Sequence, residues 1–261
     1  MTPLITAIDH LLVTTTDFES DRMHYANLLG AQANMQAPEA GTRSARFDAG
    51  NLALQLREAA ANTTGLSGLC LRCSDLPRLR RRLERLGLVA GDDAEPAPVT
   101  DGASELWLEA DAGRAYRLGF TDRPAPSRPP AATGVTGLDH VVVASRDATR
   151  TAFLFAAQLG LDLRMDLSSP DWNARLLFFR CGDAIVEVFE ALRPDTQAAE
   201  ARDTLYGLSW RVAQAAERRA ELAALGFDVS ELRRGRKPGT QVFTVRDRCA
   251  GVATLMLQPP A

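Results

Sequence analysis

Two stretches of sequence, 130 residues apart, decide the architecture of this chain: IDHLLV at residues 8–13 and LDHVVV at residues 138–143. In both copies an aspartate follows seven residues after the histidine, and the glycine of a Leu-Gly pair follows twenty residues after it. Three landmarks with one common offset indicate an internal repeat, which organises the rest of the chain.

The repeated unit predicts a strand, a helix and then further strands. Asp17 and Asp147 are typical N-caps that end the first strand and begin a helix. Gly30 and Gly160 stand where a left-handed C-cap favours glycine. Alternating apolar and polar residues then predict strands within segments 42–50, 51–58, 174–182 and 184–192.

A weaker copy of the same β-α-β-β-β module follows in each half, over residues 68–121 and 207–258. The sequence therefore predicts four modules in an α+β fold. Residues 123–134 are rich in proline, a composition typical of a semi-rigid linker. We expect an N-terminal domain over 1–122 and a C-terminal domain over 135–261.

Composition excludes several functional classes. The chain has 261 residues, with 30 Lys and Arg against 33 Asp and Glu, and this mild acidity argues against a nucleic-acid partner. No apolar run reaches the roughly 18 residues of a membrane span, and the N-terminus lacks a signal-peptide pattern. We expect a cytoplasmic protein with reduced cysteines, in which Cys70 and Cys73 belong to a strand rather than to a metal or redox site.

The landmarks resemble the glyoxalase/bleomycin-resistance/extradiol dioxygenase superfamily, also called the vicinal oxygen chelate superfamily. The resemblance covers nearly the whole chain and is strongest in LDHVVVASRD, QLGLDL and AIVEVFEAL of the second half. It implies two glyoxalase-like open-barrel domains, each made of two modules. It also implies a divalent metal (Zn, Ni, Mn or Fe) in a cup, held by a His on the first strand and a Glu on the last strand of each module.

Carried over residue by residue, the family ligands match only in part. The third module supplies His140 and Glu187. Its partner module offers Leu208 or Trp210 and then Met256, none of which is a suitable ligand. Weak or absent metal binding at His140 and Glu187 is therefore predicted. No nucleotide cofactor is expected.

The first half departs further from the family pattern. His10 matches, but Gln55 stands where the family has a glutamate, and the partner module supplies no ligand. We interpret residues 1–122 as a degenerate domain with a structural or substrate-shaping role.

Glu187 and His140 are the predicted catalytic residues. Desolvation within an apolar strand disfavours the charged carboxylate, which suits Glu187 for acid/base work. His140 carries a second proton-transfer group near neutral pH. Two alternatives stay open: His140 serves only a structural hydrogen bond, or Glu187 faces outward.

Four further residues are candidates for substrate binding. Trp210 and Phe179 would wall an apolar cup, although aromatic side chains of this kind belong more often to a core. Arg236 and Lys237 lie in a basic, glycine-rich loop that would grip a carboxylate or phosphate, unless it is only a solvated hairpin.

The sequence thus predicts a glyoxalase-like lyase or isomerase acting on a small carbonyl or hydroxy-acid compound, with or without metal. The alternatives are an antibiotic-type small-molecule binding protein of the same fold and, third, a ring-cleaving extradiol dioxygenase. The oligomeric state is left open, with a homodimer among the options.

Overall fold

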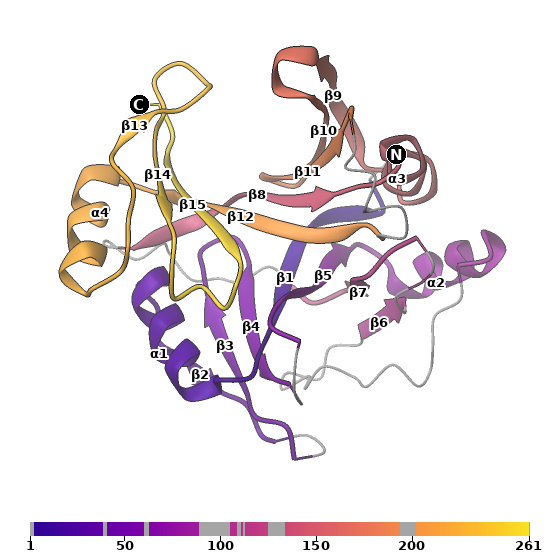
Figure 1. Cartoon of the computed structure of the whole chain (residues 1–261). Helices are drawn as coiled ribbons and strands as arrows, with labels where there is room; N and C mark the ends of the chain where they lie inside the picture. Colours follow the sequence, from indigo (N-terminus) through magenta and orange to yellow (C-terminus); the bar gives the residue numbers. More distant parts are fainter. Residues whose placement is uncertain are drawn as a thin grey trace. The chain divides into compact units, whose positions relative to one another are not determined.

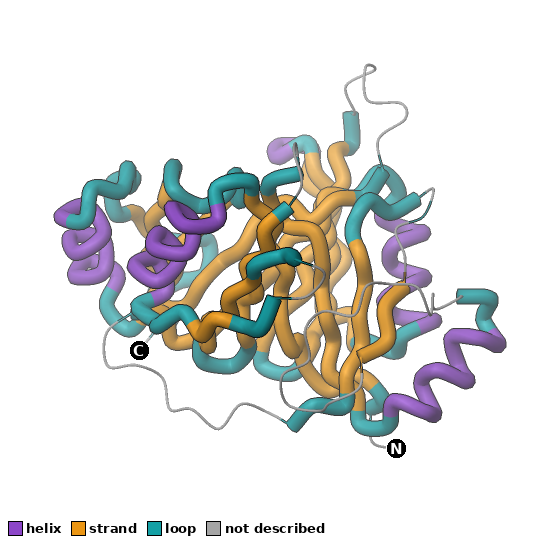
Figure 2. Tube along the Cα trace, turned by 90° about the horizontal axis from the view of Figure 1, so that it is seen from below, coloured by secondary structure: helices purple, strands orange, loops and turns teal. Residues whose placement is uncertain are grey.

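The structure is a computed structural model that describes residues 3–38, 41–59, 63–88, 105–108, 111, 113–124, 134–193 and 202–260. Most of the predicted linker lies outside the described residues. Strands make up most of the regular structure, with few helices (Figure 2).

In the first half, the elements follow the order of two modules. They are β1 (Ile5–Thr15), α1 (Phe18–Leu29), β2 (Asn34–Met35), β3 (Ser44–Asp48), β4 (Ala53–Glu58), β5 (Gly65–Cys73), α2 (Leu76–Arg85), β6 (Glu105–Leu108) and β7 (Arg117–Thr121).

The second half repeats this order. Its elements are β8 (Val135–Ala144), α3 (Ala148–Ala152), a π-helical segment (Phe153–Gln158), β9 (Asp162–Ser169), a 3₁₀ turn (Pro170–Trp172), β10 (Ala174–Cys181), β11 (Ala184–Ala191), β12 (Thr204–Val212), α4 (Ala215–Ala224), β13 (Arg233–Arg234), β14 (Gln241–Val245) and β15 (Ala253–Gln258).

The strands of each half form one sheet (Figure 1). Among the described residues the orders are β2-β3-β4-β1-β5-β7-β6 and β13-β14-β15-β12-β8-β11-β10-β9. Pairing of the first strand of a module with its last strand is parallel in β1·β4, β5·β7 and β12·β15. A parallel pair requires a long crossover, which the helix and the intervening strands supply. The predicted α+β fold of β-α-β-β-β modules is confirmed.

The helix boundaries of the repeat are also confirmed. The carboxylates of Asp17 and Asp147 each accept a backbone N–H from the first turn of the following helix. Gly30 and Gly160 end these helices with φ of 64° and 80°, in the left-handed region where a side chain is unfavourable.

The helix after β8 differs from the regular helix that the sequence predicts. After α3 it widens into the π-helical segment, and the carbonyl oxygens of Ala157 and Gln158 accept hydrogen bonds from Arg82 on α2 at 3.0 and 2.8 Å. Carbonyls at a helix end have no internal N–H partner, and the guanidinium of Arg82 satisfies them.

By their contacts, the residues divide into two compact units. Unit 1 comprises Met1–Asp9, Ser67–Arg123 and Val141–Tyr206, and unit 2 comprises His10–Leu66, Pro124–His140 and Gly207–Ala261. Unit 1 thus takes most of the second and third modules, and unit 2 most of the first and fourth. The domain limits expected from the linker stay a prediction.

Each unit has its own buried contacts. In unit 1, Phe155 packs against Phe179 with ring centroids 5.6 Å apart. In unit 2, the hydroxyl of the buried Tyr25 donates to the carbonyl oxygen of Cys249 at 3.0 Å. All four cysteines are buried free thiols. No helix among the described residues combines the length and apolarity that crossing a membrane requires.

Gly50→Ala is expected to destabilise the protein far more than Gly160→Ala. Both glycines have positive φ, which costs an alanine about 1–2 kcal/mol. A Cβ at Gly50 would in addition lie 2.1 Å from the carbonyl oxygen of Thr136, whereas a Cβ at Gly160 meets no atom within 4 Å. Overpacking of this kind adds about 1–3 kcal/mol. Urea unfolding of both variants measures the difference, and equal losses would contradict this account of Gly50.

Candidate functional site

One face of the sheet in unit 1 is apolar and accessible. Register places side chains in two rows across the strands, because cross-strand partners point to the same side. In one row Glu187 lies opposite Phe178, which lies opposite Met165; in the other, Phe189 lies opposite Leu176, which lies opposite Leu167. The amide of Ser145 donates to the carbonyl of Phe189 at 2.8 Å. This parallel register adds Val142 to the first row and Ala144 to the second. We call these eight residues the apolar face.

The opposite side of the same strands is core. Val141, Val143, Val186 and Val188 alternate with the residues of the apolar face and are completely buried. The alternation of buried and half-buried positions in β8 and β11 therefore defines which side chains a small molecule can reach.

Glu187 is half-buried, on the same side of β11 as Phe189. It is the single carboxylate of the two rows, between Val142 and Phe178. Met165 and Leu167 of the same face are 51% and 39% exposed, so solvent reaches both rows at β9.

Phe179 and Trp210 do not serve as accessible walls. Both side chains are completely buried. Phe179 lies on the core side of β10, and its neighbour Phe178 lies on the other side and is half-buried. Residues 176–179 of β10 are all apolar, so the sequence does not indicate which of them point to the core and which to the accessible side. Phe178 takes the place that was predicted for Phe179.

His140 follows the alternation of β8 onto the side of Val142 and is half-buried. In unit 2 its Nδ1 lies 2.8 Å from a carboxylate oxygen of Asp139. Burial raises the pKa of the Asp139 carboxyl, but the hydrogen bond to His140 and the positive charges of Arg211 and Lys237 outweigh it. The net pKa of Asp139 lies below its ordinary value.

The basic loop that contains Arg236 and Lys237 is a hairpin between β13 and β14. A Cβ at Gly235 would meet the hydroxyl of Thr240 at 2.2 Å, so the turn needs glycine there. The Thr240 hydroxyl donates to the carbonyl of Lys237 at 2.6 Å. The turn is closed by its own hydrogen bonds, while the side chains of Arg236 and Lys237 are exposed.

Asp9 of the first half, which the repeat aligns with Asp139, has different partners. In unit 1 the buried Asp9 carboxylate accepts hydrogen bonds from Arg72 at 2.7 Å and from Arg123 at 3.0 Å. Arg123 also bonds Glu105, so two arginines and two carboxylates form one buried network. Gln55 is buried in β4, where the family has a glutamate. The structural or substrate-shaping role of the first half stays a prediction.

Part of the chain matches the model of a known family. Residues 139–244 match the model of the Glyoxalase/Bleomycin resistance protein/Dioxygenase superfamily. The match covers about two fifths of the chain, all of it after the predicted linker. No curated protein matches the chain.

Solved structures of a glyoxalase and of dioxygenases share the fold over nearly the whole chain. The Mn(II)-bound glyoxalase from Novosphingobium aromaticivorans is 15% identical, with a TM-score of 0.76 over 98% of this chain and 82% of that chain. The 2,3-dioxygenase LapB from Pseudomonas sp. KL28 is 15% identical, with a TM-score of 0.76 over 100% of this chain and 94% of its own. The 2,2',3-trihydroxybiphenyl 1,2-dioxygenase from Sphingomonas wittichii strain RW1 is 19% identical, with a TM-score of 0.73 over 98% and 91%. These similarities establish the fold and leave the activity open.

The fourth module adds no metal ligand to His140 and Glu187. The N-caps of α3 and α4, Asp147 and Gln214, align His140 with Gly207 in the fourth module. By the register of β12 and β15, Leu255 is then the counterpart of Glu187. The expected register at Leu208 and Met256 is therefore off by one residue, although neither register supplies a ligand. Two donors fall short of the three protein ligands that catalytic zinc sites use.

Asp139→Asn is expected to make stability less dependent on pH. A carboxylate with a lowered pKa stabilises the folded state above its unfolded pKa of about 3.9, and this contribution is lost as pH falls through the lower folded value. Near pH 7 the variant should lose about 1 kcal/mol, because the pair is only half-buried. Near pH 2 it should match the wild type. Urea unfolding at both pH values, with the exposed Asp171→Asn as control, measures this; an equal deficit at both would contradict it.

Proposed function

We propose that the protein is a glyoxalase-like lyase or isomerase that moves a proton at the carbon beside a carbonyl of a small substrate, with Glu187 as the acid/base. The observation that carries this proposal is a single half-buried carboxylate in the middle of an accessible apolar face. Such a surface binds a small, partly apolar molecule and presents one group able to accept a proton.

The proposed reaction begins with enolisation. Glu187 accepts the proton as the carbon–hydrogen bond breaks, and its electron pair forms the carbon–carbon double bond of an enolate. Apolar neighbours such as Val142 and Phe178 exclude water from the carboxylate. Return of the proton to a different position gives an isomerase, and loss of a neighbouring leaving group gives a lyase.

His140 is the proposed second proton carrier. Its Nδ1 bond to Asp139 fixes the ring and makes Nε2 the nitrogen that would meet the substrate oxygen. Hydrogen bonding or proton donation from Nε2 would stabilise the negative oxygen of the enolate. Arg236 and Lys237 remain the predicted grip for an anionic substrate group.

The metal-assisted form of this reaction has less support than the metal-free form. One divalent ion on His140 and Glu187 would polarise the substrate carbonyl, but the chain supplies only these two of the four family ligands. The proposed steps therefore use the side chains alone.

Two other functions are alternatives to this reaction. A binding protein of the same fold would use the same apolar face without chemistry. An extradiol dioxygenase holds its iron by two histidines and one carboxylate. The chain has three histidines, and His140 is the only one after residue 134. Cytoplasmic location and a homodimer stay predictions from the sequence.

Glu187→Gln should slow deuterium uptake beside the carbonyl by about 10²–10⁴-fold, because it keeps the shape of the side chain and removes the proton acceptor. Proton NMR in D₂O, with α-ketobutyrate, α-ketoisocaproate and their hydroxy acids as probes, measures the exchange. Asp171→Asn, an exposed carboxylate change in the same module, is the control.

The same experiment separates the alternatives. Exchange by the wild type that survives in Glu187→Gln would remove the catalytic assignment. Tight binding of the probes with no exchange by the wild type would favour the binding protein.

A further inference from the structure

A pocket of about 470 Å³ opens at the ends of β8 and β11 in unit 1. Ala144 and Phe189, the end of the second row of the apolar face, belong to its lining, so the pocket continues the surface that carries Glu187. The lining residues are Ala144, Ser145, Arg146, Phe189, Glu190, Ala191, Leu192, Arg202 and Thr204. A pocket of this size is typical of small-molecule sites.

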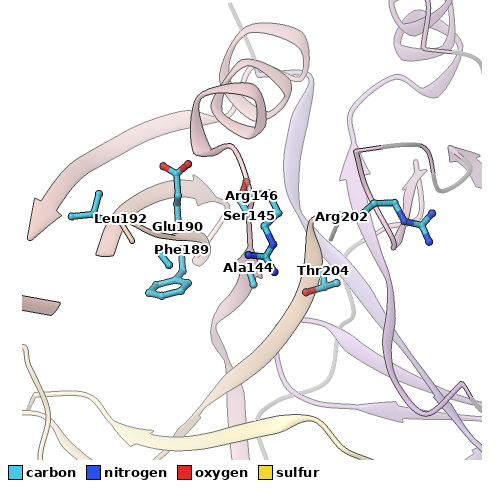
Figure 3. A pocket seen from close by; sticks show the side chains of 9 residues that line it. Ala144, Ser145, Arg146, Phe189, Glu190, Leu192, Arg202 and Thr204 are labelled. Carbon is cyan, nitrogen blue, oxygen red and sulfur yellow. The ribbon is translucent and has the colours of Figure 1, made fainter. Parts of the chain in front are cut away.

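Arg146 supplies a positive charge to this pocket. In the part of the chain that the structure describes, its guanidinium has no hydrogen-bond or ion-pair partner. Figure 3 shows this group turned down beside Ala144, between the ring of Phe189 and the hydroxyl of Thr204. A guanidinium in this position can bind a carboxylate with two parallel hydrogen bonds.

Asp203 fixes the backbone that presents Arg146. Its carboxylate is 4% exposed and accepts the amide of Arg146 at 2.8 Å and the hydroxyls of Ser145 and Thr151 at 3.1 and 2.7 Å. Its charge is paired with Arg150 at 2.9 Å. Asp203 therefore holds the end of β8 in place and leaves Arg146 for another anion.

The other charged residues of the lining point elsewhere. In Figure 3 the carboxylate of Glu190 lies on the opposite side of β11 from the ring of Phe189. The guanidinium of Arg202 is directed away from Arg146 and donates to the carbonyl of Asp111 at 3.4 Å.

We infer that this pocket binds the carboxylate of a short-chain 2-oxo or 2-hydroxy acid, with Arg146 as its anchor and Phe189 and Leu192 against its carbon chain. The inference rests on the proposed function and names its substrate class. Glu187 and Phe189 are two residues apart on one strand face, a separation of about 7 Å. A ligand that lies against Phe189 with its carboxylate on Arg146 would therefore extend its carbon chain along the same face toward Glu187.

Matched pairs of ligands test the anchor. α-Ketobutyrate differs from butanone, and α-ketoisocaproate from methyl isobutyl ketone, by a carboxylate in place of a methyl group. Titration calorimetry or NMR should show that the wild type binds each acid more tightly than its ketone. Arg146→Met should weaken acid binding by about tenfold or more and leave ketone binding within about twofold. Arg146→Lys should restore part of the loss.

Arg164→Met, which removes an exposed arginine from β9 of the same module, is the matched control and should leave both affinities unchanged. Lys237→Met tests the hairpin as the competing anchor. The inference is overturned if no acid binds more tightly than its ketone, or if Lys237→Met weakens acid binding and Arg146→Met does not.

A separate measurement distinguishes a failure of the carboxylate anchor from a failure of the proposed reaction. Glu187→Gln should lose deuterium exchange while its dissociation constant for the acids stays within about threefold. Arg146→Met should still exchange at saturating acid. Retained binding without exchange in the wild type would uphold the anchor and refute only the reaction.

Discussion

Parallel pairing between the first and last strands of each module is the constraint on which the site depends. Once Ser145 donates to the carbonyl of Phe189, the side of the sheet occupied by every residue of β8 and β11 is set. A shift of one residue would bury Glu187 among the valines and expose Val186 instead. The same rule in the fourth module brings Leu255, not Met256, to the position that corresponds to Glu187.

The repeated aspartate makes different contacts in the two halves. The N-caps align Arg72 with Arg211, and the repeat aligns Asp9 with Asp139. In the first half Arg72 and Arg123 both bind Asp9 inside a buried network, and breaking such a network leaves an uncompensated charge. In the second half Pro259 follows where Arg123 stands in the first, and Asp139 bonds His140 instead. The same position of the repeat thus belongs to a buried ionic network in one half and to a hydrogen bond with a histidine in the other.

The proposed reaction uses side chains alone, because the second half fills only two of the four ligand positions that the family resemblance implies. In the proposed reaction, His140 and the anion anchor Arg146 would stabilise the substrate oxygens that a metal would otherwise polarise. An apolar surface strengthens each remaining electrostatic contact, because fewer waters compete for it. In this proposal Glu187 on β11 is the proton acceptor, His140 on β8 is the partner of the substrate oxygen, and Arg146 in the turn after β8 is the carboxylate anchor.

The sequence alone determined the repeat, the α+β modules and the helix caps, because these depend on local patterns: fixed spacing, N-cap chemistry and glycine at positive φ. The pair His140 and Glu187 was predicted through the family resemblance. It could not assign Phe178 rather than Phe179, since both neighbours in β10 are aromatic and alternation gives no parity. Nor could it find Arg146, which in sequence is one of 29 arginines. Only tertiary structure directs that guanidinium into a pocket, because Asp203, 57 residues away along the chain, fixes the turn that carries it.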